Sequence, residues 1–284
     1  MSILGRGNKF SHEEARALVC CAILTVQNEG QSQKLVMNFA LPKNKTAESK
    51  QSLAKAWDID DWGTSLTVLE KISRADLDCL IIDEIFRHII SKSQYEITRG
   101  IFSPLKQDVL SNLNLPRNFV NLWDDVTNNA NSDFDAFLHY LSGAEDANKT
   151  FHGITASALL NRINSAISGY EQAIRTLIVF GYSMDELARI SNFCAWDIGR
   201  TGYLSKMAAS AGFIDEPTSR GYMISAAKQA YTTYLDWRQF LAAYFIGHSI
   251  KHGNAKLVGD YGDTIQYLLK NKKSPYQKHP LKSA

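Results

Sequence analysis

The least charged part of the chain lies at residues 190–211, which read ISNFCAWDIGRTGYLSKMAASA. Between Ile190 and Ser205 the only charged side chains are those of Asp197 and Arg200. These two residues are three positions apart, so a helix would place them on the same face. The positions around them are apolar or small on most sides, which is typical of a central, buried helix. A buried charge needs a partner. We therefore expect Asp197 and Arg200 to be largely buried, and paired with each other or with a third polar group.

This pair of charges has two interpretations. In the first, it is a structural ion pair that fixes the register of the helix and contributes little net stability. In the second, Arg200 anchors an anion, and Asp197 orients Arg200 or acts as a general base. The second interpretation predicts that further polar and aromatic side chains line the same pocket. The candidate polar site or structural pair then comprises Asp197, Arg200, Trp196, Tyr203 and His248.

Composition limits the classes of partner. The 31 basic and 29 acidic residues of this 284-residue chain nearly cancel, which argues against a dedicated nucleic-acid binder. The lysines between Lys270 and Lys282 could bind nucleic acid, but they are more simply explained as a solvated end of the chain. No segment approaches the roughly 20 apolar residues of a membrane span, and the apolar run 17–26 is typical of a buried helix. None of the four cysteines forms a Cys-x-x-Cys pair, so we expect a reduced, cytoplasmic protein.

Helix signals recur along the chain. Ser11-x-x-Glu14 and Ser183-x-x-Glu186 are capping boxes. The first predicts a helix to about Glu29, and the second predicts the helix that carries Asp197 and Arg200 and ends near Gly212. Apolar spacing and caps predict further helices at 46–56, 61–72, 76–91, 155–180, 215–234, 236–248 and 263–271. Clear strand alternation is absent, so we predict an all-α fold of about ten helices.

We predict one compact helical domain over residues 1–284. Its core comprises residues 11–92 and 154–271. Residues 93–153, with short helical patterns separated by Asn-rich turns, are a polar helical insertion or variable sub-layer. The basic tail, residues 272–284, carries two prolines, and we expect it to be loose.

Other motifs give weak signals for chemistry. His248 and His252 are four residues apart and could share a metal, but the adjacent Glu of a zinc-protease motif is missing and Lys251 disfavours a cation. The two histidines are explained more simply by their place near the C-terminus of a helix, where the dipole favours a protonated imidazole. The carboxylates of 57–61 are most simply helix caps. No phosphate loop, nucleophile elbow or zinc spacing is present. We therefore lean toward a protein that is not an enzyme, with no metal and no cofactor.

Several short motifs carry a family resemblance. They read Ala195-Trp196-Asp197-x-x-Arg200, Ala211-Gly212-Phe213-Ile214-Asp215-Glu216, Trp237-x-x-Phe240 and Tyr244-Phe245-Ile246-Gly247, with Trp57-x-Ile59 and Asp61 near the N-terminus. Together they resemble the bacterial domain-of-unknown-function family twelve sixty-six, mainly over residues 183–252. The resemblance implies a helical domain in a bacterial cytoplasmic protein, and it implies no reaction.

The chain departs from the pattern of that family at two positions. His248 stands where the family tends to have an arginine after the glycine of the last helix, and Lys206 stands in place of a second arginine. Arginine holds anions in a fork geometry that lysine and histidine do not reproduce. If these positions bind an anion, this chain would bind it differently.

The sequence therefore favours an uncharacterised bacterial protein that acts by binding another protein. An immunity or accessory protein of a toxin or competition system is the concrete form, by analogy only. The variable segment 93–153 would be the contact surface. The alternative is an enzyme or small-ligand binder in which the Asp197 and Arg200 pair holds a phosphorylated or nucleotide ligand. We expect no membrane partner, and the sequence leaves the oligomeric state undetermined.

Overall fold

The computed structural model describes residues 10–31, 36–74, 150–151, 154–190, 192–252 and 257–282. The described chain is almost entirely helical, as predicted, and it divides into two compact units. The boundary falls at Cys194 and again inside α14, after Tyr244. No described helix has both the length and the apolar composition needed to cross a bilayer. The predicted helix 76–91 and almost all of the insertion lie outside the described residues.

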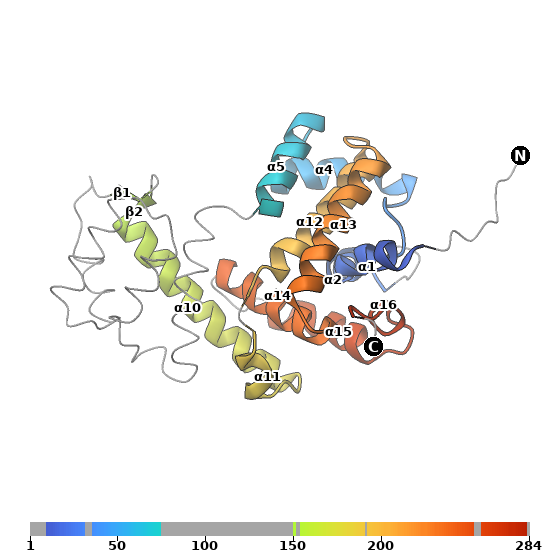
Figure 1. Cartoon of the computed structure of the whole chain (residues 1–284). Helices are drawn as coiled ribbons and strands as arrows, with labels where there is room; N and C mark the ends of the chain where they lie inside the picture. Colours follow the sequence, from blue (N-terminus) through green and yellow to red (C-terminus); the bar gives the residue numbers. More distant parts are fainter. Residues whose placement is uncertain are drawn as a thin grey trace, which may run out of the picture. The chain divides into compact units, whose positions relative to one another are not determined.

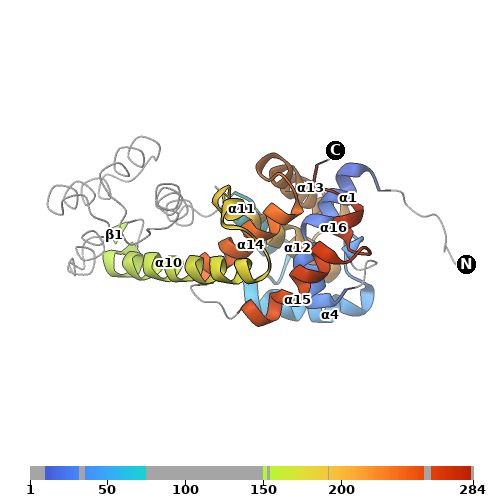
Figure 2. The same cartoon turned by 90° about the horizontal axis from the view of Figure 1, so that it is seen from below.

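The first unit holds most of the described helices (Figure 1). They are α1 (His12–Cys20), α2 (Ala22–Glu29), the 3-10 turn η1 (Lys43–Lys45), α4 (Thr46–Trp57), α5 (Trp62–Arg74), α12 (Ala195–Ala211), α13 (Glu216–Thr233), the first half of α14 (Trp237–His252), α15 (Leu257–Lys270) and α16 (Pro275–Lys278). Helix α12 contacts α1, α2, α4, α5 and α13. Figure 1 shows α12 among these elements, and in Figure 2 it lies between α13 and α4.

Helix α12 is buried on nearly every side, as its sequence predicts. All of its residues are buried except Arg200, Ala209 and Ser210. Two glycines bring its neighbours close. A Cβ at Gly199 would lie 2.7 Å from the Tyr244 ring, and a Cβ at Gly202 would lie 3.0 Å from that of Cys21. Each glycine costs roughly 1 kcal/mol of helix propensity relative to alanine, and the close packing offsets that cost.

The second unit contains the other described elements. They are the two-residue strands β1 (Thr150–Phe151) and β2 (Ile154–Thr155), the helices α10 (Ala156–Val179) and α11 (Met184–Ala188), and the second half of α14. The strands pair antiparallel, with Thr150 opposite Thr155. Helix α10 meets α14 at Gly169, where a Cβ would lie 1.9 Å from the carbonyl oxygen of Ser249. No residue larger than glycine fits at position 169 unless the backbone of α10 or α14 moves.

Local capping signals predicted several helix ends correctly. Both capping boxes are formed, at Ser11 with Glu14 and at Ser183 with Glu186. Asp61 accepts a hydrogen bond of 2.7 Å from the amide of Thr64 and so begins α5. Gly212 ends α12 in the left-handed conformation, with φ of 77°. The prediction that the carboxylates near Trp57 include helix caps is therefore confirmed for Asp61.

Two predicted helices are interrupted. The helix from Ser11 to Glu29 breaks at Cys21, which separates α1 from α2. The Ser183 box opens only α11, which ends at Ala188, and α12 begins separately at Ala195. The start of α12 has no side-chain cap of its own. Instead its Ala195 amide donates a 3.0 Å hydrogen bond to the Tyr234 hydroxyl, a contact between residues far apart in sequence that local spacing cannot predict.

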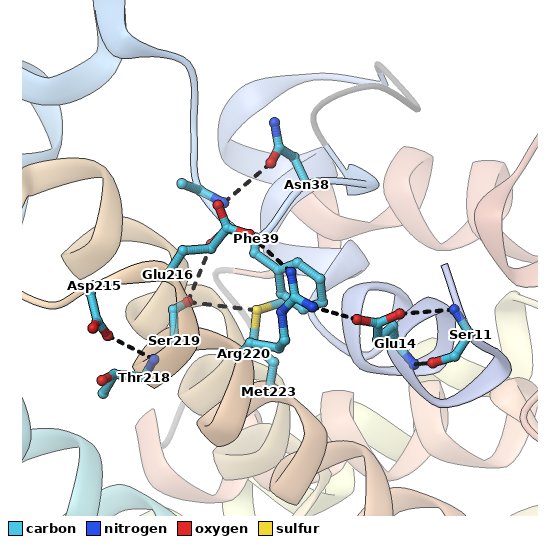
Figure 3. A network of polar contacts seen from close by, with 11 residues as sticks. Ser11, Glu14, Asn38, Phe39, Asp215, Glu216, Thr218, Ser219, Arg220 and Met223 are labelled. Carbon is cyan, nitrogen blue, oxygen red and sulfur yellow. Dashed lines mark hydrogen bonds and ion pairs between the residues drawn. The ribbon is translucent and has the colours of Figure 1, made fainter. Parts of the chain in front are cut away.

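The segment before α4 is fixed by side chains of α12 and α13. Leu41 donates its amide to Ser210 on α12. On α13, the Ser219 hydroxyl donates a 3.2 Å hydrogen bond to the carbonyl of Phe39 (Figure 3). The Arg220 guanidinium lies 4.6 Å from the centre of the Phe39 ring. Arg220 also pairs with Glu14 at 2.6 Å. The carboxylate of the α1 capping box therefore also ties α1 to α13.

The tail that we expected to be loose is packed. Ser274 caps α16, and Tyr276 and Leu281 are buried. The indole nitrogen of Trp237 donates a 2.6 Å hydrogen bond to the carbonyl of His279, and the Trp237 ring stacks on Tyr276 at 4.7 Å. Apolar side chains that flank the tail lysines therefore hold residues 274–282 against the start of α14.

Two glycine substitutions test the packing of α12. Gly199→Ala should lower the free energy of unfolding by about 1–3 kcal/mol, because the new methyl group overlaps the buried Tyr244 ring. Gly221→Ala in α13 is the matched control, since nothing lies within 4 Å of its Cβ position. It should stabilise the protein by about 0.5–1 kcal/mol through helix propensity. Urea unfolding of both variants measures the difference. Equal effects would contradict the close approach.

Candidate functional site

The Asp197 and Arg200 side chains form an ion pair on the first turns of α12. The Asp197 side chain is 7% exposed and that of Arg200 is 17% exposed. The pair is thus largely buried and joined, as the sequence leads us to expect. Asp197 also lies in the first turn of the helix, where the dipole favours a negative charge.

Two tryptophans flank the arginine of this pair. The guanidinium carbon of Arg200 lies 5.6 Å from the ring centres of both Trp57, on α4, and Trp196. The Trp196 ring in turn packs edge-on against Tyr244 at 5.0 Å. Cation–π contacts of this kind stabilise a guanidinium that is partly removed from water. Asp197 already neutralises this guanidinium from the same helix, so the geometry favours a structural pair.

Tyr203 lies one turn further along α12 and faces a different feature, which we call the Glu29 pocket. Its hydroxyl donates a 3.0 Å hydrogen bond to Oε1 of Glu29, the last residue of α2. The pocket has a volume of about 300 Å³. It is lined by Asn28, Glu29, Lys45, Glu48, Ser49, Ser52, Ala56, Trp57, Tyr203 and Met207.

The charges of the Glu29 pocket are linked through one lysine. The Glu29 side chain is 6% exposed, and its Oε2 lies 3.3 Å from Nζ of Lys45. The same Nζ lies 2.7 Å from Oε2 of Glu48, which is on the open rim. Hydrogen bonds to Glu48 and then to Glu29 raise the pKa of Lys45. Burial, followed by the nearby Glu29 charge, raises the pKa of Tyr203 well above its ordinary range.

Lys206 is a buried cation on the same helix. It is fully enclosed, and its Nζ donates a 3.0 Å hydrogen bond to the carbonyl of Val36. Burial lowers its pKa, and the nearby Cys21 and Glu29 oppose that shift. The family resemblance implies an arginine at this position. Lysine can reach the Val36 carbonyl as a single donor, without the fork geometry of an arginine.

His248 lies in the second unit. Its ring lies 4.3 Å from that of His252, as expected for residues four apart on one helix. Across the described residues, no group of three or more His, Cys, Asp or Glu side chains is placed to hold a metal ion. The structure thus brings Asp197, Arg200 and Trp196 together and places Tyr203 at the adjacent pocket.

A second hollow lies at the packed tail of the first unit, and we call it the C-terminal hollow. It has a volume of about 340 Å³ and is lined by Leu235, Asp236, Trp237, Arg238, Leu269, Lys270, Tyr276, Gln277, Pro280, Leu281 and Lys282. Its charged side chains are three cations and one carboxylate. That carboxylate, Asp236, already accepts a 2.7 Å hydrogen bond from the amide of Gln239. Leu235 is 61% exposed, so the hollow combines basic and apolar groups.

Sequence reasoning missed Glu29, Lys45 and the C-terminal hollow. Glu29 was only the last residue of a helix before Gly30, and Lys45 one lysine among several in a turn. Glu29 accepts a hydrogen bond from Tyr203, which is distant in sequence, and Lys45 pairs with Glu29. The one available signal was Trp57, which the family resemblance included and which lies beside both Arg200 and the pocket.

A double-mutant cycle measures the ion pair on α12. Asp197→Asn should destabilise the protein by about 2–3 kcal/mol, because it leaves a mostly buried guanidinium without its carboxylate. Arg200→Met should cost much less stability in the Asp197→Asn background than in the wild type. The coupling free energy between the two side chains should be at least about 1 kcal/mol. The exposed pair Glu171 and Arg175 is the control. Its cycle with Glu171→Gln and Arg175→Met should give about 0–0.5 kcal/mol. Equal couplings would refute the structural role.

The comparisons with known proteins give one match. The family described as "Protein of unknown function (DUF1266)" matches residues 52–281, which include the end of α4, the Asp197 and Arg200 pair and all of the C-terminal hollow except Lys282. No curated protein matches the chain. No solved structure matches it either. The family match covers most of the chain. The chain therefore belongs to this family of proteins of unknown function.

Proposed function

We propose that the protein acts by binding another protein, and that the C-terminal hollow receives an acidic, partly apolar segment of that partner. The observation that carries this proposal is the charge of the hollow. Arg238, Lys270 and Lys282 line it together, and its single carboxylate is engaged as a helix cap. Complementary charge steers association and selects partners.

The apolar part of the hollow supports a protein partner over a nucleic acid. Trp237 and Tyr276 are buried and stacked on one another, so neither ring offers a free face to a base. The exposed Leu235 instead offers apolar contact area of the kind found in protein interfaces. The near-neutral net charge of the chain also argues against a dedicated nucleic-acid binder.

The proposal moves the contact surface from where the sequence placed it. Residues 93–153 were the predicted surface, and nearly all of them lie outside the described residues. We retain the biological setting as part of the proposal: a bacterial cytoplasmic protein, with a toxin or competition system as the concrete case. Neighbouring genes test that setting. A toxin gene beside this one would support it, and a metabolic operon would favour a small-ligand role.

Charge reversal tests the hollow. We expect Lys270→Glu with Lys282→Glu to weaken partner binding at least tenfold, which corresponds to about 1.4 kcal/mol. Leu235→Asp should also weaken it. Lys43→Glu with Lys55→Glu is the matched control, because both lysines are exposed and lie elsewhere in the first unit. Affinity capture from a nuclease-treated lysate of the native host, followed by titration of the purified partner, measures the effect.

Three outcomes would overturn this proposal. The first is that no stoichiometric protein partner is recovered. The second is that the hollow and control variants bind equally well. The third is that the bound species is a nucleic acid, with affinity falling steeply as salt rises. A melting curve for each variant confirms that the folded protein is being compared.

A further inference from the structure

We infer that the Glu29 pocket binds a small organic cation, an amine with an apolar or aromatic body. This inference is independent of the proposed function, because the Glu29 pocket and the C-terminal hollow share no lining residue. Its volume of about 300 Å³ lies at the lower end of the range for small-molecule sites. The ligand class follows from charge, from burial and from the position of Lys45.

The lining of the pocket carries more negative than positive charge. Glu29 and Glu48 are its carboxylates, and Lys45 is its single cation. The other charges nearby do not reverse this balance. Arg200 is paired with Asp197. Lys206 interacts with the Glu29 charge from outside the lining, and its Nζ is directed to the carbonyl of Val36. A ligand cation that replaces Lys45 therefore meets two carboxylates, which would repel an anion.

Glu29 is placed to hold a charged ligand. Its side chain is largely buried, and one of its oxygens is fixed by the Tyr203 hydroxyl. A carboxylate fixed in this way is preorganised, and partial removal from water strengthens its attraction for a cation. Trp57 and Tyr203 add aromatic surface, which suits an amine that carries an apolar body.

Lys45 shows which group these carboxylates accept. Its ammonium lies within 3.3 Å of Glu29 and 2.7 Å of Glu48. Lys45 ends the short turn η1, and its side chain is 30% exposed, so it can swing toward solvent. The lysine acts as an internal occupant, and a ligand ammonium would take the place that Lys45 leaves between the two carboxylates.

Three probes with one ring and different charges test the ligand class. They are benzylamine, benzyl alcohol and benzoate, titrated into the full-length protein by calorimetry at neutral pH. We expect benzylamine to bind at least tenfold more tightly than benzyl alcohol, and benzoate to bind more weakly still. Equal binding of all three, or tighter binding of benzoate, would overturn the inference.

The lysine gives the sharpest variant. Lys45→Met keeps an unbranched side chain and removes the competing ammonium, so benzylamine should bind about five- to tenfold more tightly than to the wild type. An anion site would show the opposite change, since it would lose its only cation. Lys55→Met, on an exposed face of α4, is the matched control and should leave binding unchanged. Weaker benzylamine binding to Lys45→Met would refute the proposal.

The carboxylates complete the test. Glu29→Gln keeps an acceptor for Tyr203 while removing the charge, and it should weaken benzylamine at least tenfold. Glu48→Gln, on the exposed rim, should weaken it about threefold. Glu13→Gln is the control, because Glu13 is an exposed carboxylate outside the pocket that pairs with Lys228. If Glu29→Gln does not fold, Glu48→Gln and Lys45→Met decide the question. Unchanged binding in Glu48→Gln and Lys45→Met would overturn it.

Discussion

The burial of α12 depends above all on the ion pair between Asp197 and Arg200. A helix enclosed on almost every side must give each of its charges a polar partner, because the cost of removing a bare charge from water is large. The enclosed Lys206 of the same helix meets the carbonyl of Val36. The two charges of the ion pair neutralise each other within one turn, and two indole rings cover the guanidinium. That arrangement allows the rest of α12 to pack closely, and α12 in turn positions Tyr203 at the Glu29 pocket.

The features predicted from sequence were those with local causes. Both capping boxes, the Asp61 cap and the Gly212 stop were read correctly, because each depends on residues within a few positions. The errors share a different cause. The Tyr234 hydroxyl that begins α12 and the Trp237 contact that packs the tail join residues about 40 positions apart. Glu29 and Tyr203 are farther apart still. Periodicity and caps carry no information on such contacts.

The candidate site illustrates the same division. A charged pair in an apolar helix is visible in sequence, and its burial and pairing follow from the cost of isolated charge. Its chemical role is not visible, because that depends on what else reaches the pair. The two tryptophans and Asp197 contact the guanidinium of Arg200, while Lys206 is directed to a backbone carbonyl. The two cations of α12 are thus both engaged in holding the fold.

The two hollows of the first unit have opposite charge. The C-terminal hollow has three cations against one engaged carboxylate, whereas the Glu29 pocket has two carboxylates against one lysine. A phosphorylated ligand, which the sequence suggested for Arg200, would meet two carboxylates if it entered the Glu29 pocket. The electrostatics are consistent with the two proposals, an acidic segment at the C-terminal hollow and a small cation at the Glu29 pocket.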